Sequence, residues 1–272
     1  MTKSLSRAST YIVLIALSIL FLIPFYILIV TSLKAFEEVS FLTMWHLPKS
    51  IELSSYLTAF SELLPNLWNS FSMVIPATLL SAFIGSINGY ALSKWRFKGS
   101  EWLFSILLLG MFIPYQSILI PLIKTIEAMG LYNTITGLVI VHVIYGIPIT
   151  TLMFRNFYAS IPQSMIEAAQ IDGCGFFKTY SHVIAPLSIT GFVVVGIWQF
   201  TNIWNEFLFA ITITGHNHHP VMVALQNLAG SQVVEWNIQM AGAILAAFPT
   251  MLIYIFAGRF FIRGLLAGSV KG

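Results

Sequence analysis

Long apolar stretches alternate with short charged segments along the chain, and the gaps between charged residues outline the predicted elements. A helix that crosses a bilayer needs roughly 18 or more consecutive, mostly apolar residues. The stretches without a charged residue that exceed this length are 8–33, 63–93, 102–123, 128–154, 179–205, 207–234 and 236–258. The pattern therefore predicts a series of membrane-spanning helices, with nearly all charged residues confined to the connecting segments.

The sixth of these stretches differs from the others because it is rich in hydrogen-bonding side chains. It contains residues 215–220 (GHNHHP) and then Gln226, Asn227 and Gln232. Burying that many polar groups in hydrocarbon is costly, so we interpret this stretch mostly as a loop. The spans that remain lie at about residues 11–33, 70–92, 102–123, 134–154, 186–212 and 238–258.

Basic residues set the expected orientation, because short cytoplasmic loops carry more Lys and Arg than external loops do. With the N-terminus inside, the inner segments contain Lys3, Arg7, Lys94, Arg96, Lys98, Arg155, Lys178, Arg259, Arg263 and Lys271. The outer segments contain only Lys34, Lys49 and Lys124. Both termini are therefore expected in the cytoplasm. Residues 34–69 form the one sizeable outer segment, which we interpret as interfacial helix and loop.

Composition excludes an ordinary soluble protein. Of the 272 residues, 57% are hydrophobic and 8% are charged, whereas a soluble domain carries about 25% charged residues. The net charge of +3 is too small to indicate nucleic acid binding, and the single Cys174 excludes an intramolecular disulfide framework. The first span is too long for the apolar region of a cleavable signal. We predict an all-α integral membrane protein with a single transmembrane domain over residues 1–272.

The inner segment 155–185 is longer than a turn and has helical signals of its own. Ser160-Ile161-Pro162-Gln163 matches a capping box, with Ser160 as N-cap and Pro162 in the first turn. The helix is predicted to end at Gly173, a residue suited to the left-handed conformation. Ile161, Met165 and Ile166 are expected to offer apolar side chains to a partner. A second short segment, 176–183, completes a helix-turn-helix beneath the membrane.

The same segment carries a family resemblance. Glu167-Ala168-Ala169, three residues, Gly173, nine residues and then 183–186 (VIAP) resemble the EAA loop of bacterial ABC importer permeases. Val183 and Ala185 stand where that pattern has Ile and Leu. Further matches to the smaller permease of maltose-type carbohydrate importers lie at residues 89–92 (GYAL), 97–99 (FKG), 130–134 (GLYNT), 204–207 (WNEF) and 263–272 (RGLLAGSVKG).

This resemblance implies a type I ABC importer permease fold with six transmembrane helices in the bacterial inner membrane. It implies a heterodimer with a homologous second permease subunit, two cytoplasmic ATPase subunits that bind ATP and Mg, and an extracytoplasmic solute-binding protein that delivers a sugar. The expected function is carbohydrate import by alternating access. This chain is expected to bind no cofactor, and it lacks the phosphate-binding Gly-x-x-x-x-Gly-Lys loop and any nucleophile paired with a base.

In the family that this chain resembles, the EAA helix docks on the ATPase. The residues that correspond here are Glu167, Ala168, Ala169, Ile171, Asp172 and Gly173. We expect Glu167 or Asp172 to pair with a basic residue of the ATPase. The tail from Arg263 to Lys271 is a further candidate for that interface. Such a capped helix, joined to two spans by short arms, can transmit a movement of its partner into those spans.

Glu206 is the one charged residue placed inside a predicted span, where an acid at the bilayer centre costs roughly 2.5–3.5 kcal/mol. Positions 199, 202 and 206 share one helical face, which is therefore polar. The candidates on this span are Trp198, Gln199, Asn202, Asn205 and Glu206. Two interpretations stay open: these residues line a sugar pathway, or Glu206 lies near the outer interface and secures helix packing.

Three histidines in the predicted loop at residues 215–220, His216, His218 and His219, raise the alternative of a membrane metalloenzyme, since imidazole is a common metal ligand. No acidic residue lies nearby in the sequence, so a solvated loop is the simpler interpretation, and we expect no metal site. A second alternative keeps the transporter but changes the substrate to glycerol phosphate or another polyol. No Lys or Arg lies inside the predicted spans, which favours a neutral sugar.

Overall fold

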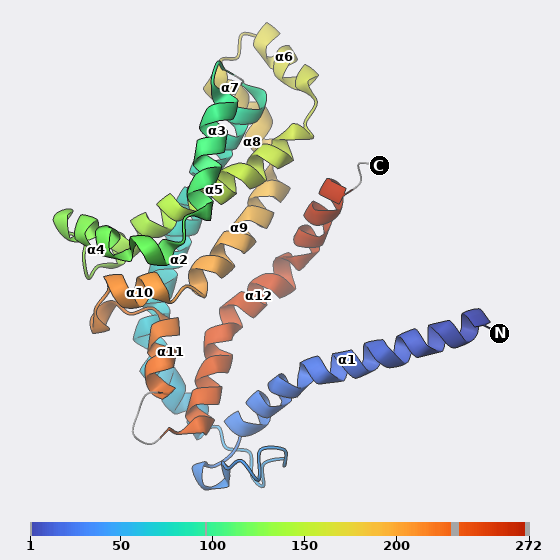
Figure 1. Ribbon diagram of the computed structural model, residues 1–272, viewed down its shortest axis with the longest axis vertical. Coiled ribbons are helices and arrows are strands. Elements are labelled where there is room, and N and C mark those ends of the chain that lie inside the picture. The colour runs from blue at the N-terminus through green and yellow to red at the C-terminus, as the bar shows by residue number, and fades with distance from the viewer. Residues whose placement is uncertain (1, 96, 230–233, 270–272) are drawn as a thin grey trace. The chain divides into compact units, whose positions relative to one another are not determined.

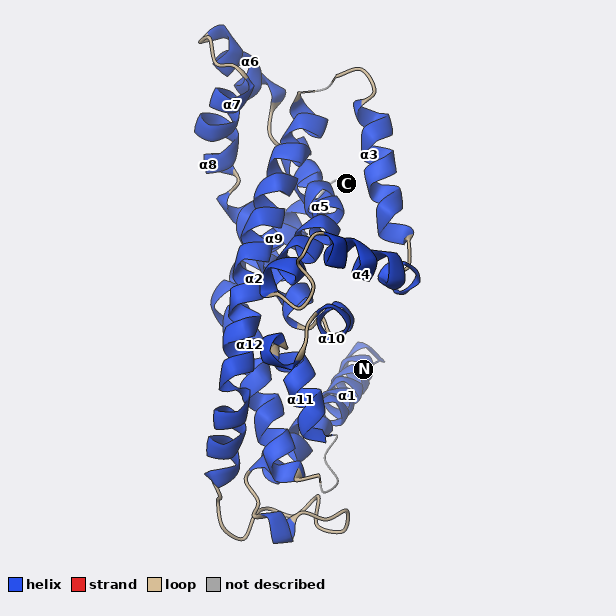
Figure 2. Ribbon diagram, turned by 90° about the vertical axis from the view of Figure 1, so that its left-hand side faces the viewer, coloured by secondary structure: helices blue, strands red, loops and turns tan. Residues whose placement is uncertain are grey.

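The computed structural model describes residues 2–95, 97–229 and 234–269, with side chains described for residues 7, 9–95, 97–229 and 234–258. Every regular element in these residues is helical, as Figure 2 shows by its colouring. The residues group into two compact units, which are Met1–Pro65 with Ala224–Phe248 and Asn66–Val223 with Pro249–Gly272. The single domain expected from the sequence stays a prediction.

Four helices are long and apolar enough to cross a membrane within the described part of the chain. They are α1 (Thr2–Ser32), α2 (Ser54–Lys94), α5 (Ile135–Ala159) and α12 (Trp236–Ser269), labelled in Figure 1. Two bent pairs raise the possible number of spans to six if each pair crosses as one. These helices and pairs overlap the six ranges expected from the charge gaps.

The first bent pair lies over the span expected at residues 102–123. It joins α3 (Ser100–Leu109) and η2 (Gly110–Phe112) to η3 (Tyr115–Ile118) and α4 (Leu119–Ala128), with an angle of 88° between the two parts. The bend falls at Pro114, whose backbone is extended (φ −60°, ψ 117°). Proline has no N–H to donate and cannot continue the helix, which explains the break.

The second bent pair lies over the fifth expected span. It joins α7 (Phe176–Thr179), the π-helical turn η4 (Tyr180–Ile184) and α8 (Ala185–Leu187) to α9 (Ile189–Trp204) at an angle of 77°. The chain breaks again at residues 205–207 before α10 (Leu208–Ile213), η5 (His216–His218) and α11 (Val221–Ala229). The fifth span is therefore interrupted beside Glu206, where a continuous helix was expected.

The outer segment is more helical than expected. It begins with the short η1 (Phe36–Glu38) and a loop, and α2 then starts at Ser54, well before the predicted span at residue 70. Glu62 is exposed on this added part of α2. A charged residue marks the end of the apolar stretch but does not end a helix, which explains why the charge gaps located the span and missed the helix start.

The inner loop contains the expected helix, α6 (Gln163–Ile171), at one end of the second unit beyond α7 (Figure 1). The predicted capping box is wrong: Ser160 is the C-cap of α5, its Oγ donates to the Phe157 carbonyl at 2.7 Å, and Pro162 precedes α6 without a side-chain cap. Because α5 continues through Ala159, the preceding helix claims Ser160.

The predicted end of this helix is confirmed. Gly173 has a φ of +79°, in the left-handed region. The Gly173 N–H donates to the Gln170 carbonyl at 3.0 Å, and the Cys174 N–H donates to the Ala169 carbonyl at 2.9 Å. This pair of bonds is a Schellman motif, which usually places glycine at the left-handed position.

Candidate functional site

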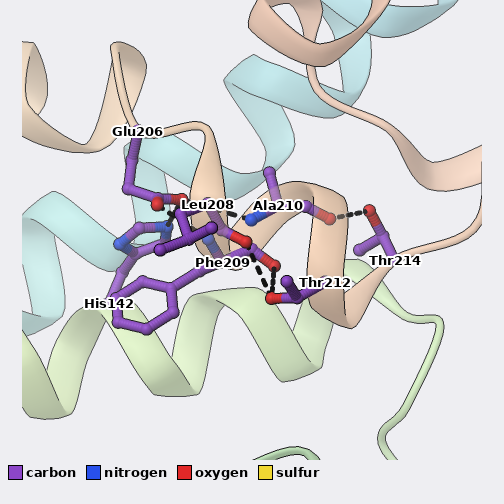
Figure 3. Close-up of polar contacts among 7 residues, drawn as sticks. All are labelled: His142, Glu206, Leu208, Phe209, Ala210, Thr212 and Thr214. Carbon is purple, nitrogen blue, oxygen red and sulfur yellow. Dashed lines mark hydrogen bonds and ion pairs between the residues drawn. The ribbon is translucent and has the colours of Figure 1, made fainter. Parts of the chain in front are cut away.

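Glu206 lies at the break between α9 and α10, where it caps the second helix. Its Oε1 accepts the Phe209 N–H at 2.7 Å and its Oε2 accepts the Ala210 N–H at 3.2 Å. Figure 3 shows the carboxylate between these two amides and the ring of His142. The carboxylate thus satisfies backbone donors that the short helix α10 leaves open at its start, and this compensates part of the cost of placing it there.

His142 on α5 faces this carboxylate. Its Nε2 lies 3.8 Å from Glu206 Oε2, and the His142 side chain is only 5% exposed. That distance exceeds a hydrogen bond, and among the described residues His142 Nε2 has no hydrogen-bond partner. Buried polar atoms are normally hydrogen-bonded, so this nitrogen can bond a further polar group.

A cavity of about 520 Å³ opens beside this pair. Its size falls in the range of about 300–1,000 Å³ that is typical of small-molecule sites. The residues around it come from η3, α5, α9 and the break before α10. They are Tyr115, His142, Tyr145, Gly146, Ile149, Trp198, Gln199, Thr201, Asn202, Ile203, Asn205, Glu206 and Phe209.

All five candidates on this span, Trp198, Gln199, Asn202, Asn205 and Glu206, line this cavity. Gln199, Asn202 and Glu206 are the three that were expected to share one helical face. The amide groups of Asn202 and Asn205 donate to carbonyls one turn back on the chain, at 2.8 Å each. Their amide oxygens are then the groups that can accept hydrogen bonds from a ligand.

Helix α5 supplies the residues that the sequence analysis missed. His142 and Tyr145 lie on the same side of α5, and Gly146 follows them. A Cβ at Gly146 would collide with the amide nitrogen of the buried Gln199 side chain, so only glycine lets α9 bring Gln199 this close. A histidine in an otherwise apolar span was the signal available from the sequence.

Phe209 contacts three other rings on the aromatic side of the cavity. Its ring centre lies 5.2 Å from that of Tyr115, 5.0 Å from that of Tyr145 and 5.9 Å from that of His142. Aromatic faces beside amide and carboxylate groups suit a ligand with apolar C–H faces and many hydroxyls. Among the described residues, no Lys or Arg lines the cavity, so a phosphate group would find no cationic side chain there.

The predicted docking surface on α6 divides into exposed and buried residues. Glu167, Ala168 and Asp172 are exposed, and Ile171 is 86% exposed. Ala169 is buried within this chain, and its role in docking stays a prediction. The expectation for Ile161 and Ile166 is also wrong: both are buried in the core of this chain, because the amphipathic face of α6 packs inward.

This core ties α6 to the long helices. Ile161 and Ile166 pack in one cluster with Tyr90, Phe154 and Tyr158. The Lys94 ammonium, at the end of α2, donates to the Ile161 carbonyl at 2.5 Å. The packed cluster and this hydrogen bond therefore join α6 to the ends of α2 and α5.

A buried hydroxyl cluster continues this connection. Ser86 Oγ on α2 lies 2.5 Å from the Tyr158 hydroxyl on α5 and 2.8 Å from the Tyr180 hydroxyl on η4. One serine thus links α2, α5 and η4.

His218 and His219 contact polar groups of the chain around them. His218 Nδ1 lies 3.3 Å from Asn133 Oδ1, and His219 Nε2 lies 3.2 Å from the Thr214 carbonyl. In the described part of the chain, no group of three or more His, Cys, Asp or Glu side chains could hold a metal ion. The metalloenzyme alternative therefore gains no support from these residues. The tail 270–272 lies outside the described residues, as do the side chains of 259–269.

Comparisons with known proteins identify the family. Residues 77–266 match the family model described as the inner membrane component of binding-protein-dependent transport systems. A probable ABC transporter permease of Pyrococcus horikoshii is 47% identical, with 98% of each chain covered. The xylose/arabinose import permease of Haloferax volcanii is 34% identical, with 96% of this chain and 93% of that protein covered.

A solved structure matches the fold. It is the crystal structure of a bacterial ABC transporter involved in the import of the acidic polysaccharide alginate, and one of its chains aligns with a TM-score of 0.80. The alignment covers 94% of this chain and 97% of that one at 19% identity, so it supports the fold alone. The chain therefore belongs to the family of binding-protein-dependent inner membrane transport components, which are multi-pass, non-catalytic permease subunits that work with ATPase subunits and a substrate-binding protein.

Proposed function

We propose that this chain forms part of the pathway through which an ABC importer moves a carbohydrate into the cell, and that the cargo passes through the cavity beside Glu206. The observation that carries the proposal is the convergence of amide, carboxylate and imidazole groups with aromatic rings around one space of about 520 Å³. Sugars present both hydroxyls and apolar C–H faces, and this lining offers a complement to each.

The proposed cargo is neutral. A carboxylate lines the cavity and, among the described residues, no Lys or Arg does, so a phosphate-bearing polyol would meet an unfavourable charge. The name of the Haloferax relative, a xylose/arabinose import permease, supports a carbohydrate over other neutral solutes.

We also propose the arrangement of the complex. This chain pairs with a homologous second permease subunit, and both of its termini lie in the cytoplasm. The exposed residues Glu167, Ala168, Ile171 and Asp172 dock on an ATPase subunit, and Gly173 holds the end of that helix. ATP and Mg bind to the ATPase subunits, and this chain holds no cofactor. Closure of the ATPase dimer moves α6, and the packed core carries that movement to α2 and α5 as the cavity changes its access.

The test is uptake by the complete complex reconstituted in vesicles, with xylose, arabinose, glucose and glycerol 3-phosphate as cargo. Glu206→Gln and Asn202→Ala are expected to alter uptake of the transported sugar without loss of assembly. Asn156→Ala is the matched control, because Asn156 is an exposed asparagine on α5 outside the cavity. Wild-type uptake kinetics in both cavity variants would leave the polar face a purely structural role.

A further inference from the structure

The outer loop, residues 40–48, follows the end of α1 and is held by hydrogen bonds. Lys34 is only 2% exposed, and its ammonium donates to the Thr43 carbonyl at 2.7 Å. The Thr43 hydroxyl in turn donates to the Glu38 carbonyl at 2.6 Å. Lysine is rarely buried unless its charge is paired or bonded, so this contact fixes the outer loop in place.

A second contact places the loop beside the outer part of α1. The Tyr26 hydroxyl donates to the Trp45 carbonyl at 2.8 Å. Tyr26 lies six residues before Ser32, the last residue of α1, which is about 9 Å along a helix axis. Helical side chains lean toward the N-terminus, so this hydroxyl does not project past the helix end. The outer loop therefore turns back along α1 to the level of an apolar span.

The tip of the loop exposes large apolar side chains. Phe41 and Leu42 are each 86% exposed, and Leu47 is 71% exposed. Trp45 is exposed between them, next to the Tyr26 hydroxyl. A hydrogen-bonded loop that presents four such residues outward needs a partner surface, because exposing them to water is unfavourable.

Charge separates the tip from its base. Glu37 and Glu38 precede the tip, and Lys49 and Glu52 follow it, whereas residues 41–48 contain no Asp, Glu, Lys or Arg and one histidine, the exposed His46. The Lys49 N–H donates to Glu38 Oε2 at 3.2 Å, which brings the two charged arms together. An apolar tip with Trp, on a charged base beside a membrane-spanning helix, matches the pattern of segments that insert at a bilayer interface.

We propose that the tip of the outer loop, formed by Phe41, Leu42, Trp45 and Leu47, inserts into the headgroup and acyl boundary of the leaflet that surrounds the C-terminal end of α1. With the orientation proposed above, this is the outer leaflet. The bilayer is the partner that fits, because the tip lies along α1, whose side chains from Tyr11 to Phe25 are nearly all exposed in the same unit. The loop thus anchors the outer end of α1 in lipid.

Spin-label accessibility tests this proposal without any cargo. Nitroxide labels are attached to Phe41→Cys and Leu42→Cys, with Leu47→Cys as a further tip position, in a Cys174→Ser background that removes the only cysteine of this chain, and the labelled chain is then combined with its partner subunits. The complete complex is reconstituted in phosphatidylcholine and phosphatidylglycerol vesicles. Power saturation then measures collision with oxygen, which concentrates in lipid, and with a water-soluble nickel chelate. Ser50→Cys is the matched control, since Ser50 is exposed at the charged base.

The proposal predicts that oxygen collides with the tip labels more often than the nickel chelate does, and that the order reverses at Ser50. A higher nickel accessibility at the tip would place it in water and overturn the proposal. Low accessibility to both reagents would place another protein surface over the tip and would overturn it equally. Because no transport step is involved, neither result bears on the proposed sugar pathway.

Discussion

Two glycines that flank Cys174 allow α6, the proposed docking helix, to be perturbed through backbone conformation alone. Gly173 has a φ of +79°, whereas Gly175 has a φ of −78° and a ψ of −178°, which any residue adopts. A Cβ added at either position meets no atom within 4 Å. Alanine at these two sites therefore differs in backbone strain and not in steric fit within this chain.

The magnitude follows from the left-handed conformation. A residue with a Cβ pays roughly 1–2 kcal/mol there, which corresponds to a factor of about 5–30 in an equilibrium constant. Gly173→Ala is expected to weaken the affinity of the permease for its ATPase subunit by up to this factor, because the turn after α6 must be formed for docking. Gly175→Ala is expected to be neutral or slightly stabilising, since alanine restricts the unfolded chain.

The assay is a titration of labelled ATPase subunit into permease held in nanodiscs, followed by ATP hydrolysis in the reconstituted complex. Gly173→Asn supplies an intermediate case, because asparagine tolerates the left-handed region better than alanine does. Equal affinities for wild type, Gly173→Ala and Gly175→Ala would refute the reasoning. Equal weakening by both alanine variants would also refute it, because that result would assign the effect to the side chain and not to φ.

Three further predictions concern stability and use thermal unfolding of the purified complex. Arg155→Lys loses the paired bonds to Glu101 at 2.6 and 2.7 Å, and it should cost no more than about 1 kcal/mol because Glu101 is exposed; added salt should shrink the difference from wild type. Tyr158→Phe removes a buried hydroxyl contact with Ser86, which should cost about 0.5–1.5 kcal/mol, and an unchanged unfolding temperature would contradict this. Burial lowers the pKa of His219, so the folded state favours its neutral form, and its stabilising contribution is present above the unfolded pKa of about 6.5 and is lost as the pH falls. His219→Asn should flatten that part of the pH profile, and an identical profile in wild type and variant would contradict the assignment.

Charge gaps in the sequence locate the spans because a charged group in hydrocarbon is costly, and this cost acts locally. The same signal does not detect the part of a helix that extends beyond the membrane. This explains why the start of α2 was expected near residue 70, whereas the helix begins at Ser54. The signal also does not detect breaks inside an apolar stretch, such as those at Ser188 and at residues 205–207. The bend in the third span falls at Pro114, where proline cannot continue the helix.

The polar face of the cavity could be predicted because Gln199, Asn202 and Glu206 share helical spacing on one segment. The opposite wall could not, since His142 carries no spacing pattern and meets Glu206 only through the packing of α5 against α9. Helix α6 was also predicted only in part. Its end followed from one glycine, but Ser160 was assigned to the wrong helix because the tertiary extent of α5 decides which element it caps.

The central claim, that cargo passes through the cavity beside Glu206, is tested most directly by chemical modification at Asn202. Asn202→Cys in the Cys174→Ser background is treated with a charged, membrane-impermeant thiol reagent in the reconstituted complex, with Asn156→Cys as the control outside the cavity. The account predicts that modification at position 202 stops uptake, that the transported sugar slows the modification, and that modification at position 156 does neither. Uptake at the unmodified rate by the fully modified Asn202→Cys complex would contradict it.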